Sequence, residues 1–271
     1  MATSGRAVVV GGSLGGLLAT RVLADHFAEV VLVERDRFPA GPEARKGVPQ
    51  ARHLHVLLQG GERILEAYFP GLRDELLRDG ATLLDMAGDT RWRFFGGWKR
   101  RFRSGLMVLS QSRAFLEWKV RERVEALPGV RFRDGAVAAG LTLAGDRVAG
   151  LVLDGGETVP ADLVVDASGR GSRTPRWLAA VGRDVPPETE VAVDVGYASR
   201  FYRRPPGFQA DWRALMIYPR AGGTRLGVLF PAEDGRWMVT LVGWFGDHPG
   251  ADDSAFLDFA RSLDAPDLFD A

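Results

Sequence analysis

Short apolar runs alternate with stretches of helical periodicity in the first part of the chain. Residues 7–10 are apolar and mostly β-branched, which predicts a strand buried on both faces. Leucines and valines then recur at helical spacing from Leu14 to about Phe27. A second apolar run covers residues 30–33 and ends at Glu34. Strand, helix and strand in this order predict a βαβ unit whose crossover is right-handed.

The middle of the chain has a mixed pattern. Residues 38–50 are rich in proline and glycine and are predicted to form a loop, and helices are predicted over about 53–68 and 113–126. Further strands are predicted at 91–95, 102–109, 130–132, 148–153 and 161–166. We expect the strands at 130–132 and 148–153 to belong to a meander that turns at Asp154-Gly155-Gly156.

The pattern changes after Pro186-Pro187. Four strand-like runs follow at 191–200, 214–218, 225–230 and 237–242, and aromatic residues are common among them. A last helix, capped by Asp252, Asp253 or Ser254, passes through Phe256 and Phe259. The predicted fold class is therefore α/β, with a Rossmann-like domain of βαβ unit plus meander and a mainly antiparallel β domain.

Composition narrows the classes of function. The chain has 271 residues, enough for one large domain or two modest ones, and its formal net charge is zero. Nothing in this balance indicates a nucleic-acid partner. Cysteine is absent, which excludes disulfides and thiolate sites and fits a cytoplasmic location. No apolar stretch approaches the roughly 18 residues of a membrane span, and we expect no signal peptide.

A glycine turn joins the first strand to the first helix and reads Gly11-Gly12-Ser13-Leu14-Gly15-Gly16. In a dinucleotide fold the first glycine makes the turn, the second admits the pyrophosphate, and the third lets the helix pack on the strand. Here Ser13 takes the second place, where its hydroxyl could donate to a phosphate. Glu34 lies 34 − 11 = 23 positions after Gly11, close to the spacing of about 20 expected for the acid that binds ribose.

The glycine turn and a pair of histidines each allow another interpretation. The turn also matches G-x-S-x-G, the nucleophile elbow of α/β-hydrolases, with Ser13 as nucleophile and His248 as base. Only six residues precede the strand, however, so no upstream loop is present to complete an oxyanion hole, and Glu34 is left unexplained. His53 and His55 do not predict a metal site, because a spacing of two on a helix turns them about 200° apart.

Two longer motifs carry a resemblance to a known family. Residues 45–55 read Arg-Lys-Gly-Val-Pro-Gln-Ala-Arg-His-Leu-His, and residues 161–173 read Ala-Asp-Leu-Val-Val-Asp-Ala-Ser-Gly-Arg-Gly-Ser-Arg. With the βαβ unit, they resemble the FAD-dependent monooxygenases of the para-hydroxybenzoate-hydroxylase structural class. Within that class the chain looks most like the flavin epoxidases of polyether antibiotic biosynthesis, the monensin type. The resemblance covers nearly the whole chain.

The resemblance implies a cofactor, a reaction and a set of contacts. The cofactor is FAD, which is reduced by NADH, NADPH or a reduced flavin system. One oxygen atom of O2 is then transferred through a flavin C4a-hydroperoxide to a small apolar natural product, by epoxidation or hydroxylation. The flavin supplies the chemistry, and the protein supplies orientation and a dry pocket. The implied cofactor-binding residues are Gly11, Gly12, Ser13, Gly15, Gly16, Glu34, Arg35, Arg45, Val48, Pro49, Gln50, Arg113, Val137, Asp166, Ala167, Ser168 and Gly169.

The resemblance also implies an arrangement of domains. Residues 1–80 and 105–182 form the FAD-binding domain, and residues 81–104 and 183–271 form the substrate domain. A third FAD motif, which begins with Gly-Asp, is expected beyond residue 271, because Gly246-Asp247 lies where a turn of the substrate sheet belongs. The alternative functions are a flavin-dependent reductase of isoprenoid double bonds, similar to geranylgeranyl reductases, and an inactive remnant of such an enzyme.

Two sequence details bear on the choice of reaction. Ser168 stands where aromatic hydroxylases of the class have the aspartate of an Asp-Gly motif linked to NADPH use, so the preferred pyridine nucleotide is left open. The segment Trp237-Met238-Val239-Thr240 lacks the Trp-x-Trp-x-Ile-Pro motif of flavin-dependent halogenases. Halogenation is therefore disfavoured relative to oxygen transfer.

Overall fold

The computed structural model describes residues 4–271 and divides the chain into two compact units. The first unit contains the segment up to Pro49 and Glu117–Glu190, and the second contains Gln50–Leu116 and Val191–Ala271. Each unit is therefore built from two separate stretches of chain. Within residues 4–271, no helix has the length and apolar character needed to cross a membrane.

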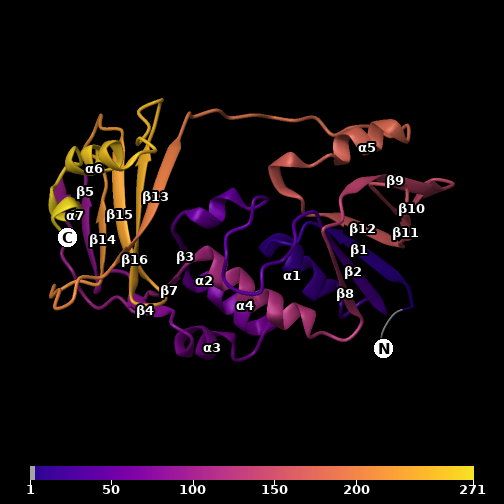
Figure 1. Cartoon of the computed structure of the whole chain (residues 1–271), viewed down its shortest axis with the longest axis horizontal. Coiled ribbons are helices and arrows are strands. Elements are labelled where there is room, and N and C mark those ends of the chain that lie inside the picture. The colour runs from indigo at the N-terminus through magenta and orange to yellow at the C-terminus, as the bar shows by residue number, and fades with distance from the viewer. Residues whose placement is uncertain (1–3) are drawn as a thin grey trace. The chain divides into compact units, whose positions relative to one another are not determined.

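A four-stranded parallel sheet forms the centre of the first unit (Figure 1). Its strands are β1 (Arg6–Val10), β2 (Glu29–Glu34), β8 (Val130–Asp134) and β12 (Leu163–Asp166), in the order β12-β1-β2-β8. Helix α1 (Leu14–Leu23) connects β1 to β2. The carboxyl ends of β1, β2 and β12 therefore lie at one edge of the sheet, beside the start of α1.

The two faces of this sheet explain why β1 is apolar at every position after Arg6. Ala7 and Val9 belong to a buried cluster that includes residues of α1, whereas Val8 and Val10 belong to a cluster on the opposite face. That second cluster includes Leu151 and other residues of an antiparallel sheet, β9 (Ala138–Ala144), β10 (Arg147–Leu153) and β11 (Thr158–Pro160). Helix α5 (Thr174–Ala180) contributes Trp177 to it. Both faces of β1 are covered, so no polar residue is needed.

The second unit contains a six-stranded sheet in the order β13-β16-β15-β14-β5-β6 and a three-stranded sheet in the order β3-β7-β4. The strands of the larger sheet are β5 (Thr90–Phe94), β6 (Gly97–Trp98), β13 (Gly196–Arg203), β14 (Ala214–Ile217), β15 (Arg225–Ala232) and β16 (Arg236–Gly243). The smaller sheet contains β3 (His55–Leu57), β4 (Thr82–Asp85) and β7 (Met107–Gln111). Only the β14–β5 pair is parallel among the pairs of these two sheets described within residues 4–271.

Seven further helical segments complete the described chain. Those of the second unit are α2 (Gln59–Tyr68), α3 (Leu72–Arg78), α6 (Asp253–Arg261) and α7 (Asp267–Asp270), and α4 (Arg113–Glu125) begins in the second unit and continues into the first. Two short 3₁₀ segments occur at Pro49–Arg52 and Gly169–Gly171.

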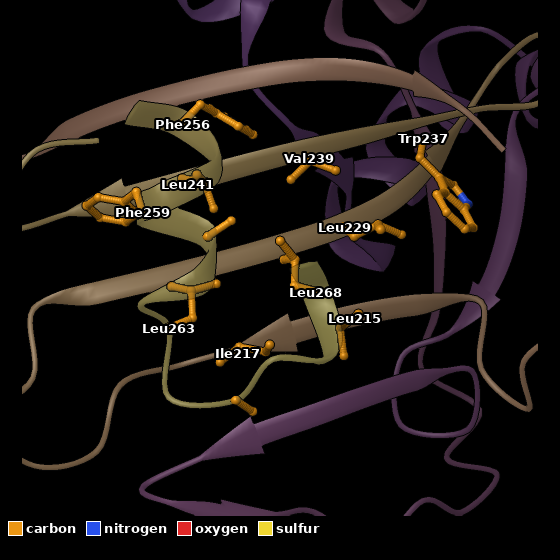
Figure 2. Close-up of a cluster of buried hydrophobic side chains, with 12 residues drawn as sticks. Leu215, Ile217, Leu229, Trp237, Val239, Leu241, Phe256, Phe259, Leu263 and Leu268 are labelled. Atoms are coloured by element: carbon orange, nitrogen blue, oxygen red, sulfur yellow. The ribbon is translucent and has the colours of Figure 1, made fainter. Parts of the chain in front are cut away.

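The larger sheet of the second unit also has two buried faces. On one face Leu215, Leu229 and Leu241 pack against α6 and α7, which lie across the strands (Figure 2). On the other face Met216, Val228 and their neighbours pack against residues of the β3-β7-β4 sheet. The side-chain period of two therefore separates two apolar cores within one strand.

The structure confirms the predicted fold class and corrects two predicted elements. The helix predicted at 53–68 begins only at Gln59, because residues 55–57 pair with β7 as strand β3. The strand predicted at 130–132 in a meander is β8, which pairs in parallel with β2 instead. The compact units divide the chain differently from the predicted domains. Residues 50–80 and 105–116 pack with the second unit, because β3 and β7 contribute to its core, and residues 183–190 belong to the first unit.

Asp247, next to the turn after β16, makes stability depend on acidity. Its carboxylate accepts hydrogen bonds from Arg225 Nε at 2.8 Å and Nη2 at 2.7 Å, and from Thr224 Oγ1. These bonds lower the pKa of Asp247 to about 2. Because the folded pKa lies below the unfolded value, this stabilisation is present above pH 3.8 and is lost as the pH falls towards 2.

We therefore expect the Asp247→Asn variant to be less stable than the wild type at neutral pH, with the difference shrinking below pH 4. Urea unfolding followed between pH 7 and pH 2 measures it. A constant difference across this range would show that the carboxylate charge does not contribute.

Candidate dinucleotide-binding site

At two positions of the glycine turn after β1, a side chain would collide with backbone atoms. Gly11 has φ +100°, and a Cβ there would lie 2.5 Å from the Ala167 carbonyl oxygen. A Cβ on Gly16 would lie 1.7 Å from the Gly11 carbonyl oxygen. Glycine at both positions is therefore required for α1 to start against the end of β1 and for the turn to approach residue 167.

The beginning of α1 presents backbone donors that no side chain caps. Its first intrahelical hydrogen bond joins the Leu17 amide to the Ser13 carbonyl, so the amides of residues 14–16 precede it. Ser13 at the N-cap makes no capping hydrogen bond through its side chain, and the first turn contains no acidic residue. Gly15 faces open space. Such a helix end favours an anionic group.

A cavity of about 130 Å³ lies at this edge of the parallel sheet. Its lining comes from the glycine turn, the end of β2, the loop before residue 49, the start of β9, and the segment after β12. The lining residues are Val10, Gly11, Gly12, Ser13, Val33, Glu34, Arg35, Gly47, Val48, Ala136, Val137, Ala138, Ala167, Ser168, Gly171, Arg173 and Trp177. The carboxyl end of a parallel sheet is where ligands bind in open α/β folds.

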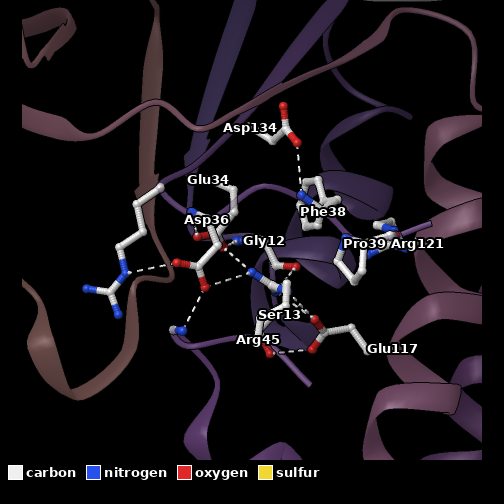
Figure 3. Close-up of polar contacts among 12 residues, drawn as sticks. Gly12, Ser13, Glu34, Asp36, Phe38, Pro39, Arg45, Glu117, Arg121 and Asp134 are labelled. Atoms are coloured by element: carbon white, nitrogen blue, oxygen red, sulfur yellow. Dashed lines mark hydrogen bonds and ion pairs between the residues drawn. The ribbon is translucent and has the colours of Figure 1, made fainter. Parts of the chain in front are cut away.

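Glu34 closes one side of the cavity and is itself 6% exposed. Its carboxylate accepts from the Gly12 amide at 2.7 Å and from the Asp36 amide at 2.9 Å. Arg45 Nη1 lies 3.1 Å from Glu34 Oε2. The acid at the end of the second strand is thus fixed against the glycine turn, as Figure 3 shows.

Arg45 lies among three carboxylates, those of Glu34, Asp36 and Glu117, in the interior of the unit (Figure 3). Its Nη2 donates to Glu117 Oε1 at 2.6 Å and to the Gly12 carbonyl at 3.0 Å. Burial alone would lower the pKa of Arg45, but its ion pairs with Glu117 and Glu34 outweigh that effect, so the pKa is raised. The guanidinium therefore stays charged and holds the turn to both carboxylates.

Ser13 is also tied to this cluster. Its hydroxyl donates to Glu117 Oε2 at 2.8 Å. While this bond is in place the same hydrogen cannot serve a phosphate, so the expected contact requires the hydroxyl to rotate. The geometry also disfavours the hydrolase interpretation, because the serine partner is a carboxylate and not a histidine. His248 belongs to the other compact unit and contacts Asp194.

Asp166, at the end of β12, holds the segment that follows it. Its carboxylate accepts from the Ser168 amide at 2.8 Å and from the hydroxyls of Ser172 and Thr174. Burial raises the pKa of Asp166, but these hydrogen bonds outweigh it and lower the pKa overall. The segment 167–173 is thereby shaped into one wall of the cavity.

The structure brings together about half of the residues predicted to bind the cofactor. Those that line the cavity are Gly11, Gly12, Ser13, Glu34, Arg35, Val48, Val137, Ala167 and Ser168. Those that do not line it are Gly15, Gly16, Arg45, Pro49, Gln50, Arg113, Asp166 and Gly169. Within this second set, Gly16, Arg45 and Asp166 shape the cavity from behind, and Gln50 and Arg113 belong to the second unit.

Sequence reasoning missed Glu117, Asp36, Gly47 and the pair Arg173 and Trp177. Asp36 Oδ2 accepts from the Gly47 amide at 2.6 Å, which joins the loop to the end of β2. Glu117 follows Arg113 by one helical turn, and no local pattern marks it as a partner of residues more than 70 positions away. Its role is visible only in three dimensions.

Comparison with known proteins assigns the chain to a protein family. Residues 7–176 match the family model described as FAD dependent oxidoreductase. The match covers more than half of the chain, and the chain belongs to this family.

Particular relatives are consistent with this assignment. Protein Rv3254 of Mycobacterium tuberculosis is 35% identical in an alignment 251 residues long, which covers 88% of this chain and 53% of the relative. The chain therefore spans about half the length of this curated relative.

Solved structures show the same fold. PqsL, a probable FAD-dependent monooxygenase from Pseudomonas aeruginosa, matches with a TM-score of 0.67 at 17% identity, over 89% of this chain and 61% of PqsL. A 2-methyl-3-hydroxypyridine-5-carboxylic acid oxygenase matches with a TM-score of 0.67 at 21% identity, over 99% of this chain and 66% of that one. The flavin-dependent brominase Bmp2 matches with a TM-score of 0.61 at 14% identity, over 89% of this chain and 56% of Bmp2.

Proposed function

We propose that this chain is the FAD-binding part, with a substrate domain, of a flavin-dependent monooxygenase that hydroxylates or epoxidises a small apolar natural product. The observation that carries the proposal is the cavity where the uncapped start of α1, Glu34 and the segment after β12 meet. The fold shared with PqsL and the hydroxypyridine carboxylate oxygenase supports oxygen transfer over double-bond reduction.

The residues present fit the ADP half of FAD. The uncapped amides of residues 14–16 suit the pyrophosphate, and the open space at Gly15 leaves room for it. Each oxygen of Glu34 accepts one backbone hydrogen bond, and a carboxylate has about four acceptor sites in all, so it can also accept from ribose hydroxyls. Arg35 and Arg173 line the cavity and add positive charge.

The chain's own residues bind and orient the cofactor. When bound, FAD supplies two-electron redox chemistry and the reaction of its reduced ring with O2. Arg45 and Glu117 hold the turn, and Asp166 holds the opposite wall, so the site is formed before the ligand enters. We propose NADH or NADPH as the electron donor and the remaining residues implied by the resemblance, including Pro49, Gln50, Arg113 and Gly169, as further contacts along the cofactor.

Calorimetric titration with FAD, ADP and riboflavin tests the binding step. We expect FAD and ADP to bind and to compete with each other, and riboflavin to bind at least tenfold more weakly, because the cavity offers an anion site and a ribose site. If neither FAD nor ADP binds, the proposed function is wrong.

The reaction class is tested with isotopically labelled O2, NADPH or NADH, and farnesol as an isoprenoid olefin. A monooxygenase gives a product heavier by one labelled oxygen atom. A double-bond reductase instead gives a product heavier by two hydrogen atoms and consumes no O2, and that result would replace oxygen transfer with reduction.

A further inference from the structure

His53 ends a row of hydrogen-bonded side chains in the second unit. Its Nδ1 lies 2.9 Å from Ser199 Oγ, and Ser199 Oγ lies 2.6 Å from Thr240 Oγ1. Thr240 Oγ1 accepts from the Leu54 backbone amide at 3.2 Å. The row therefore joins the loop before β3 to β13 and β16, and nothing in the FAD site uses it.

This row lies on a defined face of the antiparallel sheet. Ser199 and Thr240 are direct partners in the β13–β16 pairing, so their side chains share one face. Tyr197 and Phe201, two positions before and after Ser199, share it as well and are 55% and 41% exposed. The His53 and Tyr197 rings lie 5.6 Å apart between centroids. An imidazole is thus placed beside accessible aromatic surface.

The Leu54 amide fixes the direction of the row, because a backbone N–H can only donate. Thr240 accepts that hydrogen, so every hydroxyl hydrogen finds an acceptor only if Thr240 donates to Ser199 and Ser199 donates to His53 Nδ1. In the opposite direction the hydrogen of Thr240 has no acceptor among residues 4–271. The imidazole therefore accepts at Nδ1 and carries its proton on Nε2.

The surroundings keep His53 neutral. Burial lowers the pKa of His53 below 6.5, and the charges of His55 and Arg52 lower it further. Tyr197 is the other titratable group that faces the ring. His53 Nε2 has no hydrogen-bond partner in the described part of the chain and is not enclosed by protein atoms. A neutral N–H donor is therefore available to a ligand on this face.

We propose that His53 is a specificity-determining residue that donates a hydrogen bond from Nε2 to a carbonyl or phenolic oxygen of a conjugated substrate lying against Tyr197 and Phe201. Ser199 and Thr240 are positioning residues that fix the tautomer. This inference rests on the proposed monooxygenase function in one respect: that the ligand bound by His53 is the substrate of the reaction. It favours an oxygen-bearing conjugated molecule over a plain olefin, because only the former accepts the hydrogen bond.

Histidine NMR of the full chain tests the tautomer. The chain has four histidines, and the His53→Gln variant assigns the signal of His53. Long-range proton–nitrogen correlations should show a protonated Nε2 and an unprotonated Nδ1 at pH 7. In Ser199→Ala the donor to Nδ1 is lost, so the His53 pKa should rise, whereas Ser199→Thr keeps the hydroxyl and should restore it. A proton on Nδ1 in the wild type overturns the assignment.

Two isosteric probes test the ligand class without FAD. Acetophenone carries a carbonyl oxygen, and α-methylstyrene carries a methylene group in its place. We expect acetophenone to shift the His53 signals and to bind about three- to tenfold more weakly to His53→Phe, the worth of one neutral hydrogen bond. α-Methylstyrene cannot accept the hydrogen bond, so it should not cause the hydrogen-bond shift at His53 Nε2, and it should bind both proteins alike.

The outcomes separate this proposal from the proposed function. If acetophenone leaves His53 unshifted, or if both probes act alike, the proposed role of His53 is wrong even when FAD binds. If acetophenone shifts His53 as expected but FAD and ADP do not bind, the donor role stands and the monooxygenase proposal fails.

Discussion

Replacing Gly16 with alanine is expected to destabilise the first unit by about 3 kcal/mol, because the added methyl group meets backbone and not a movable side chain. The new Cβ would lie 1.7 Å from the Gly11 carbonyl oxygen, so α1 must move away from the end of β1. Moving α1 also opens the anion site, and ADP binding should weaken at least tenfold. Urea unfolding and calorimetric titration with ADP measure the two effects.

Gly15→Ala is the matched control, one position earlier in the same helical turn. A Cβ on Gly15 meets nothing within 4 Å. Alanine is preferred over glycine in helices by about 1 kcal/mol, so this variant should be as stable as the wild type or more stable. If Gly15→Ala and Gly16→Ala cost the same, the effect reflects a general intolerance of the turn to substitution, and the contact with Gly11 does not explain it.

Replacing Arg45 with methionine is the second change with a large expected effect. Its side chain is 4% exposed and contacts both Glu34 and Glu117. Removing one partner of a buried ion pair leaves an uncompensated charge and costs about 3–5 kcal/mol. We therefore expect a loss of this size at pH 7, measured as the free energy of unfolding in urea.

The pH dependence of the Arg45→Met variant identifies the cause. Without the guanidinium, burial should raise the pKa of the remaining carboxyl groups in the folded protein above the unfolded value. The folded variant then binds more protons than the unfolded chain, and its deficit relative to the wild type should shrink as the pH falls from 7 to 5. A deficit that stays constant over this range points to lost packing instead.

Arg37 supplies the comparison for an exposed pair. It lies 3.5 Å from Asp134 and its side chain is 83% exposed. Exposed ion pairs contribute at most about 1 kcal/mol, so Arg37→Met should change stability little.

A double variant tests the coupling between Arg45 and Glu117. In Arg45→Met, Glu117→Gln the loss of unfolding free energy should be smaller than the sum of the two single losses, because both substitutions remove the same ion pair.

The first βαβ unit was predictable because its signals are local. The apolar run at 7–10, the glycines at 11 and 16, and Glu34 all lie within one short segment, and each has a distinct physical requirement. The cap of the last helix was predictable to within three residues, 252–254, for the same reason. The structure selects Asp252, whose side chain accepts from the Ala255 amide.

Elements that depend on distant partners were not predictable. Residues 130–132 have the composition of any short strand, and only pairing with Val30 and its neighbours makes them the parallel edge strand β8. Residues 55–57 have a pattern that is compatible with a helix, but they pair instead with strand β7, which lies more than 50 positions later in the chain. Glu117 illustrates the same limit for the site, since it accepts hydrogen bonds from Ser13 and Arg45, which lie more than 70 positions earlier in the chain.

The interleaving of the two units has a consequence for synthesis on the ribosome. β1 finds its first neighbour, β2, within about twenty residues of emerging, but its other neighbour, β12, begins only at Leu163. Until then one edge of β1 carries unpaired amides and carbonyls in a strand with no charged residue after Arg6. Slow translation between residues 34 and 163 should therefore favour aggregation of nascent chains, and an early-binding chaperone should find its target in the first strand and helix.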